Sequence, residues 1–220
     1  MQVKLEHVER YQYVGLFTVL VGVLFVHPYL AEGSRDFLLS LLVALIPAMA
    51  VVALVDQRAM VVVGIILGIP ATLAILNDSL GGVFGSGWLV LLLPLAFYGF
   101  ATTVICYHVL TEPRVGVDTL LGAICGYLML GFTWSGAYGV LISQEPASFY
   151  TTHSGEHAVV SDLFYFSFVT LTTLGYGDIV PVTAKAQSLA MMEAITGVLY
   201  LAVLVSRLVA MYGAARRERS

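Results

Sequence analysis

Long apolar segments constrain this chain more than any other feature of its sequence. Residues 37–55, for example, contain no charged side chain. An α-helix needs about 20 apolar residues to cross the hydrocarbon core of a bilayer, which is about 30 Å thick. The sequence therefore predicts an all-α integral membrane protein with six transmembrane helices. The six segments are 11–31, 37–55, 59–76, 88–110, 119–142 and 186–213.

The amino-acid composition supports this fold class. Of the 220 residues, 59% are hydrophobic and 11% are charged, whereas a typical soluble domain has about 25% charged residues. A water-soluble protein of this length could not bury so much apolar surface. The composition therefore excludes a soluble enzyme, a nucleic-acid-binding protein and a disordered chain. The motifs of a nucleotide site or a metal site are not visible either, so we expect no enzymatic activity and no cofactor.

The positions of lysine and arginine predict how the chain is oriented, because cytoplasmic loops are enriched in these residues. With six crossings and both termini in the cytoplasm, only Arg35 and Lys185 lie outside, and the other eight basic residues are cytoplasmic. This orientation puts segment 143–185 on the outer side. We expect the basic residues within 216–219 to contact anionic lipid headgroups.

Segment 143–185 is too long for a simple turn, and its second half is apolar. We expect a helix over 161–172, capped by Ser161 or Asp162. Twelve residues rise about 18 Å in an α-helix, which is too short to cross a membrane. Glycines follow this helix. The pattern predicts a re-entrant segment that enters the membrane from outside and returns as extended chain.

Non-helical backbone at membrane depth is costly unless it is buried in protein or lines a water-filled path. Gly175 and Gly177 can adopt positive φ at little cost, and their spacing lets successive carbonyl groups point the same way. With the hydroxyl of Thr173, such carbonyls can replace the hydration shell of a monovalent cation. Because one chain supplies only one wall, four chains around one axis are needed. The carbonyls concerned belong to Thr173, Leu174, Gly175 and Tyr176.

Residues 170–178, Thr-Leu-Thr-Thr-Leu-Gly-Tyr-Gly-Asp, resemble the signature sequence of potassium channels. Residues 119–213 resemble the whole two-helix pore module of that family, and most closely its prokaryotic members. The resemblance implies a homotetrameric ion channel that conducts K⁺ passively through a selectivity filter. It implies an outer helix over 119–142, a pore helix over 161–172, a filter over 173–177 and an inner helix over 186–213.

The resemblance also implies roles for individual residues. The ion-binding filter would consist of Thr173, Leu174, Gly175, Tyr176 and Gly177, with K⁺ at the first four of these. Filter support would come from Thr172, Asp178, Tyr165 and Phe166, and Gly197 stands where many members have a hinge glycine.

Two departures from the family pattern affect these expectations. Leu174 replaces the commoner valine, but it presents the same backbone carbonyl, so we expect selectivity to survive. Val169 stands where some members have a glutamate that pairs with the filter aspartate. Asp178 is therefore expected to lack that partner, and slow inactivation of the filter is expected to differ.

Six crossings invite comparison with voltage-gated channels, whose fourth helix carries regularly spaced arginines. Segment 88–110 contains no lysine or arginine, and His108 is its only titratable side chain apart from tyrosines and Cys106. We therefore divide the chain into a four-helix domain without voltage-sensor charges (1–114) and a pore domain (115–220). Voltage dependence is expected to be weak or absent.

Three further residues have open interpretations. Glu193 is an acid within the last helix, and such residues are functional candidates. It is either hydrogen-bonded to a pore-helix hydroxyl such as that of Thr170 or Thr172, which is a structural role, or it tunes conduction or gating through its charge. His153 and His157 in the outer loop form either a metal or proton sensor or ordinary solvated loop side chains.

The sequence thus predicts a potassium channel, an ion-transport protein of the plasma membrane, with membrane lipids and three further copies as neighbours and no nucleic-acid partner. A prokaryotic cell is the expected source, with N- and C-termini in the cytoplasm. Two alternatives remain at this stage. One is a weakly selective cation channel, and the other is a non-conducting accessory membrane subunit.

Overall fold

The computed structural model describes residues 12–30, 36–54, 58–77, 82, 88–112 and 116–217. Several basic residues behind the predicted orientation lie outside these ranges, and so does the predicted domain boundary near residue 114. The helices are α2 (Gln12–Leu30), α3 (Asp36–Ala53), α4 (Arg58–Ile75), α5 (Trp88–Thr111), α6 (Val117–Gln144), α7 (Val160–Leu171) and α8 (Ala184–Arg217). The basic residues outside the described ranges are Lys4, Arg10, Arg35, Arg114 and Arg219.

Each apolar segment found in the sequence coincides with one long helix. Among the described residues, three stretches are long and apolar enough to cross a membrane: Val90–Thr111, Val117–Gln144 and Ala184–Arg207. The apolar parts of α2, α3 and α4 are shorter. The chain is therefore a mostly helical membrane protein, whereas crossing by the first three helices stays a prediction.

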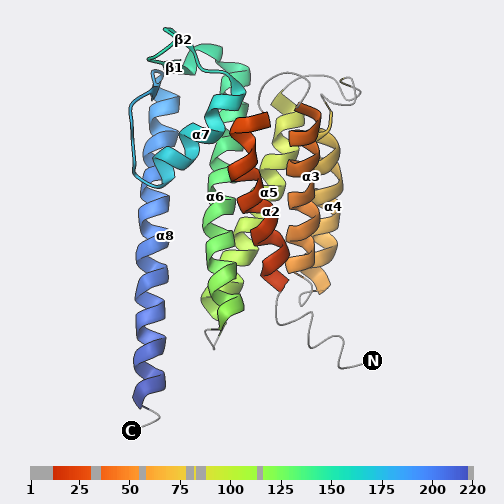
Figure 1. Ribbon diagram of the computed structural model, residues 1–220, viewed down its shortest axis with the longest axis vertical. Helices are drawn as coiled ribbons and strands as arrows, with labels where there is room; N and C mark the ends of the chain where they lie inside the picture. The colour runs from red at the N-terminus through yellow and green to blue at the C-terminus, as the bar shows by residue number, and fades with distance from the viewer. Residues whose placement is uncertain are drawn as a thin grey trace.

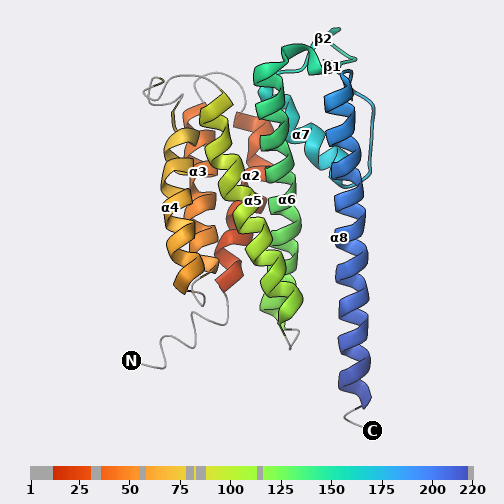
Figure 2. The same cartoon turned by 180° about the vertical axis from the view of Figure 1, so that it is seen from behind.

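The helices form two unequal groups. Helices α2 to α6 stand side by side as a bundle, while α8 stands apart from it and runs roughly parallel to α6 (Figures 1 and 2). The short helix α7 lies between α6 and α8 near one end of the molecule (Figure 1). One apolar core joins α2 and α5 to the outer helix α6, with Leu16, Phe97 and Met129 fully buried.

Close packing of α7 against α6 depends on a glycine. A methyl group at Gly131 would lie 2.6 Å from the ring of Phe168. That ring packs edge-on against Phe132, with 5.9 Å between ring centroids. Small residues at helix contacts let backbones approach closely inside membranes. The sequence of α6 therefore provides the space into which the short helix fits.

The connection between α6 and α8 corrects the all-α prediction. It contains a short 3₁₀ helix, η2 (Pro146–Ser148), and a three-stranded antiparallel sheet in the order β2-β1-β3. Thr151 of β1 pairs with Ile179 of β3, and Tyr150 pairs with Val180. The sheet therefore ties the chain that leaves the filter motif to the segment that follows α6. The strands are β1 (Phe149–Thr151), β2 (Glu156–His157) and β3 (Ile179–Pro181).

The N-terminus of α7 also differs from the prediction. The helix begins at Val160, and Val159 occupies the cap position. Asp162 Oδ2 accepts the backbone N–H of Val159 at 2.9 Å, so the carboxylate closes the helix end from its first turn. Ser161 lies inside the helix and is not the cap.

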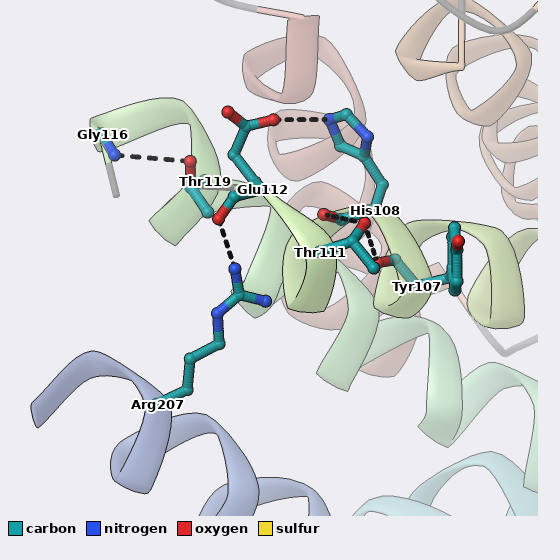
Figure 3. Close-up of polar contacts among 7 residues, drawn as sticks. All are labelled: Tyr107, His108, Thr111, Glu112, Gly116, Thr119 and Arg207. Carbon is teal, nitrogen blue, oxygen red and sulfur yellow. Dashed lines mark hydrogen bonds and ion pairs between the residues drawn. The ribbon is translucent and has the colours of Figure 1, made fainter. Parts of the chain in front are cut away.

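A basic residue joins the far end of α8 to the bundle. The Arg207 guanidinium donates a hydrogen bond to the backbone carbonyl of Glu112, at the end of α5 (Figure 3). His108 Nε2 lies 3.9 Å from the Glu112 carboxylate in the same cluster. The last carbonyls of a helix lack partners within the helix and carry partial negative charge. The cation therefore sits where the end of α5 favours positive charge.

We predict that Arg207→Met lowers the free energy of unfolding by about 1.5 kcal/mol, because a hydrogen bond from a charged donor is lost. Thermal or denaturant unfolding of the purified protein in detergent measures this difference. Arg207→Lys is the matched control: it keeps the charge but not the planar fork of donors, so its loss should be smaller. Equal stability of the Met variant and the unaltered protein would contradict the assignment.

Candidate ion-conducting site

The backbone after α7 takes an unusual alternating conformation. Gly175 and Gly177 have positive φ values of 56° and 75°. Thr173 also has positive φ, at 59°, and it is the only non-glycine residue in the described part of the chain that does. The sequence indicated the two glycines but not Thr173, because threonine seldom adopts this conformation without tertiary support. Every second residue over 173–177 therefore has left-handed backbone.

Two hydrogen bonds fix which way this backbone faces. The N–H groups of Leu174 and Gly175 both donate to the carbonyl oxygen of Val169 in α7, at 2.9 and 3.3 Å. In a planar trans peptide, the C=O points opposite to the N–H. The carbonyls of Thr173 and Leu174 therefore both point away from α7. A regular strand would alternate them between its two faces.

The segment is exposed in the single chain. Leu174 and Tyr176 retain 55% and 67% of their possible exposure, and residues 172–177 are all exposed. Backbone carbonyls and large apolar side chains share this open surface. The segment therefore has the form of one wall of a site that other groups complete.

The side chain of Asp178 has a partner that the sequence did not indicate. The Tyr165 hydroxyl donates to Asp178 Oδ2 at 2.7 Å. Tyr165 is therefore the donor of this bond, and the Asp178 carboxylate is the acceptor. Asp178 has no glutamate partner on α7, as expected from Val169. Its carboxylate instead accepts a hydrogen bond from Tyr165 of the same helix.

The two aromatic residues predicted to support the filter do different things. Tyr165 faces Asp178, as described above. Phe166 is buried and packs edge-on against Tyr138 and Phe149, at centroid distances of 5.2 and 5.1 Å. Phe166 therefore holds α7 against α6 and β1. Among the described residues, its ring contacts are with Tyr138 and Phe149 and not with Tyr176.

The end of the segment that is predicted to form the filter is bound to the loop between α6 and α7. Thr152 N–H donates to the Asp178 carbonyl at 2.8 Å, and Thr152 Oγ1 lies 3.1 Å from the same oxygen. Thr152 Oγ1 also approaches the Gly177 carbonyl at 3.5 Å. The Gly177 carbonyl thus faces the loop. Thr152 was not found from the sequence, because nothing in its local pattern distinguishes it from other loop threonines.

Gly197 has a packing role in the structure. The helix α8 is continuous through it, and a methyl group there would overlap the carbonyl oxygen of Leu171 and lie 3.0 Å from Leu171 Cδ1. The same carbonyl accepts a hydrogen bond from Tyr127 of α6 at 3.1 Å. Three helices therefore meet at the residue that ends α7, and glycine makes the contact with α8 possible.

Glu193 is fully buried, and its partners differ from those predicted. Its Oε1 lies 2.5 Å from Ser167 Oγ of α7, and its Oε2 lies 2.5 Å from the Tyr138 hydroxyl of α6. Thr172 Oγ1 instead donates to the Phe168 carbonyl of its own helix. The expected bond between Glu193 and a hydroxyl of this short helix is therefore present, but the hydroxyl belongs to Ser167 and not to Thr170 or Thr172. Only the packing of three helices brings these partners together.

The outer-loop histidines do not form a metal site in the described part of the chain, where no three His, Cys, Asp or Glu side chains gather. His157 lies in β2, with Nδ1 3.3 Å from the Phe149 carbonyl and its ring against Tyr150. In the same connection, Lys185 at the start of α8 forms an ion pair with Glu145 at the end of α6. His157 thus has a structural place in the sheet.

Comparisons with known proteins point to the same segment. Residues 122–213 match a family model described as "Ion channel". Over 48 residues, 22% of this chain and 17% of the relative, the chain is 50% identical to "Two-pore potassium channel 4" of Arabidopsis thaliana. It is 35% identical over 86 residues to "Two pore potassium channel c" of Oryza sativa subsp. japonica, covering 39% of this chain and 17% of the relative.

A bacterial relative is similar over a comparable length. The chain is 31% identical over 93 residues to "Uncharacterized membrane protein YdjJ" of Bacillus subtilis, covering 42% of this chain and 27% of that protein. No solved structure matches the chain. The chain spans less than a third of each of these relatives. Residues 122–213 are thus similar to an ion-channel family, and stretches of the chain are similar to potassium channels. The similarity supports a membrane location.

We predict that Gly197→Ala destabilises the protein by about 1–3 kcal/mol, because overpacking a close contact forces backbone to move. The clash is with a backbone carbonyl, which cannot rotate away as a side chain can. The midpoint of thermal unfolding in detergent measures the effect. Gly139→Ala in α6 is the matched control, since a methyl group there meets nothing within 4 Å. Equal behaviour of the two variants would refute the close contact.

Proposed function

We propose that this protein is a potassium-selective ion channel in which four identical chains surround one pore. The observation that carries the proposal is the backbone over 173–177. Its alternate positive φ angles and its two N–H bonds to Val169 direct successive carbonyls away from α7. Rings of such oxygens can replace the water around K⁺. Ions would bind at Thr173, Leu174, Gly175 and Tyr176.

The exposure of α8 supports assembly around an axis. Glu193, Tyr200 and Arg207 are seven residues apart, so they share one face of the helix. That face contacts the chain's own α5, α6 and α7: Tyr200 donates to the Ala123 carbonyl at 2.5 Å. The opposite face is apolar and exposed, with Ile195 at 58% and Val198 at 52%. We propose that it lines the pore.

Three residues of α8, Val198, Leu201 and Ser206, are candidates for lining the pore, and the helical phase separates them. Val198 and Ser206 lie on the side of the helix opposite to Glu193, whereas Leu201 lies on its flank. An inner helix held on one face and open on the other would present Val198 to permeating ions and Leu201 to a neighbouring subunit. Accessibility of introduced cysteines to a water-soluble thiol reagent distinguishes the two positions.

We propose passive transport without enzymatic chemistry and without a cofactor other than the permeant ions. The site would lie in the plasma membrane of a prokaryotic cell, with both termini in the cytoplasm and lipids around α2 to α5. These helices would serve as a scaffold beside the pore. No nucleic-acid partner is proposed.

Two alternatives make different measurable predictions. A weakly selective cation channel would keep the same backbone but admit Na⁺, because side chains such as Leu174 would hold the carbonyls loosely. An accessory subunit would carry the filter sequence without conducting. Bi-ionic reversal potentials in K⁺ and Na⁺ separate the first alternative from the proposal, and flux through the purified chain alone separates the second.

We predict that the purified protein, reconstituted into liposomes, releases K⁺ down its gradient and that barium blocks the release. Gly177→Val is the matched inactive control, because an L-residue at positive φ is strained by about 1–2 kcal/mol and a branched side chain by more. Flux is measured with a K⁺-sensitive electrode or dye. Equal release from empty liposomes and from the purified protein would eliminate the proposal.

We also predict that the open probability changes little with membrane potential. Moving one charge through 100 mV is worth about 2.3 kcal/mol, and segment 88–110 offers no lysine or arginine for this work. Current recordings from planar bilayers over a range of potentials give the gating charge. A value of several charges per subunit would show that another part of the chain senses voltage.

A further inference from the structure

A chain of hydrogen bonds crosses the interior between the filter helix and its two neighbours. It runs from the Tyr138 hydroxyl of α6 to Glu193 Oε2, from Glu193 Oε1 to Ser167 Oγ of α7, and from Ser167 Oγ to the Gly131 carbonyl oxygen of α6. The three oxygen–oxygen distances are 2.5, 2.5 and 2.8 Å. Glu193 and Ser167 are fully buried, and Tyr138 is too, so water has no access to the chain.

The number of protons available to this chain of hydrogen bonds identifies the protonation state of Glu193. Three hydrogen bonds require three protons. The hydroxyls of Tyr138 and Ser167 supply one each, and the Gly131 carbonyl supplies none. With all three contacts made as hydrogen bonds, the third proton lies on Glu193. Tyr138 then donates to Oε2, Oε1 donates to Ser167, and Ser167 donates to Gly131, so every bond in the chain has a donor.

The surroundings of Glu193 favour the same state. From α6, Tyr138 and Tyr127 are the titratable groups that face it, and Tyr127 donates to the Leu171 carbonyl. From α7 the facing group is Ser167, which does not titrate. Among the described residues, no lysine or arginine pairs with Glu193. An ionised carboxylate without a cation is costly to bury, and it leaves one of the three bonds without a proton.

We infer that Glu193 is a protonated, uncharged positioning residue that holds the filter helix against α6 and α8. Its proton fixes the direction of the hydrogen-bond chain. This inference rests on the proposed channel function, because the helix it holds is the one whose Val169 carbonyl accepts the Leu174 and Gly175 N–H groups. Ionisation at alkaline pH would break one bond and put a charge behind the filter.

Three variants test the inference. Glu193→Gln keeps a donor and an acceptor in the same places without a titrating group. Glu193→Met removes both but keeps a side chain of similar length. Ser167→Ala removes the link to Gly131 and serves as a second probe if the Met variant does not fold. Each is compared with unaltered protein by infrared spectroscopy and by bi-ionic potentials over a range of pH.

The inference predicts a carbonyl stretching band of a buried carboxylic acid at neutral pH that Glu193→Gln removes. It predicts unchanged K⁺/Na⁺ selectivity in the Gln variant at every pH, and a fall in selectivity at alkaline pH in the unaltered protein. The Met variant, which loses both hydrogen bonds of Glu193, should show a loss of K⁺/Na⁺ selectivity at every pH. Ser167→Ala should lose selectivity in the same direction.

The outcomes that overturn the inference are separate from those that overturn the channel. Absence of the acid band would show that Glu193 is ionised, whatever the flux. A band that is present, together with normal selectivity in the Met and Ala variants, would show that the proton has no positioning role. Loss of all flux in the unaltered protein would instead overturn the channel proposal, and the infrared result would stand by itself.

Discussion

Main-chain amides and carbonyls that leave a helix inside a bilayer have no water to bind, and each unsatisfied group is costly. The segment after α7, which the sequence predicts to lie within the membrane, has partners for part of its backbone. Its first amides return to α7 through the Val169 carbonyl, and its outer end is bound by Thr152 and by pairing of β3 with β1. Carbonyls that face away from α7 are left for something else to satisfy. The rest of the architecture follows from holding this short stretch in that geometry.

Helix α7 is held from three sides by different kinds of contact. Behind it, Phe166 packs into an aromatic cluster with Tyr138 and Phe149. Toward α6, Gly131 gives the ring of Phe168 its space. Toward α8, Gly197 admits the Leu171 carbonyl, and the Glu193 chain adds directional bonds. Packing fixes how near α7 lies, while hydrogen bonds fix its rotation, so the two kinds of contact complement each other.

The long helix α8 connects this region to the far end of the bundle. Its contacts recur at Glu193, Tyr200 and Arg207, and they reach α7, α6 and α5 in turn. Because these residues share one face, α8 is joined to its own chain along a single line. The opposite face is left apolar and open. One face of α8 thus connects the end of α5, helix α6 and helix α7, while the other face stays exposed in the described part of the chain.

The amino-acid sequence by itself determined the long helices, the short helix and the unusual backbone after it. Apolar length and polar interruptions are local signals, and glycine spacing directly reports permitted φ angles. Strands of two or three residues carry too little pattern to be recognised, so the sheet was missed. Only the tertiary structure decided that Tyr165 binds Asp178, that Gly197 serves a close contact, and that Glu193 meets Ser167 and Tyr138. The members of each pair come from separate elements of the fold, and their meeting depends on how those elements pack, which no local pattern encodes.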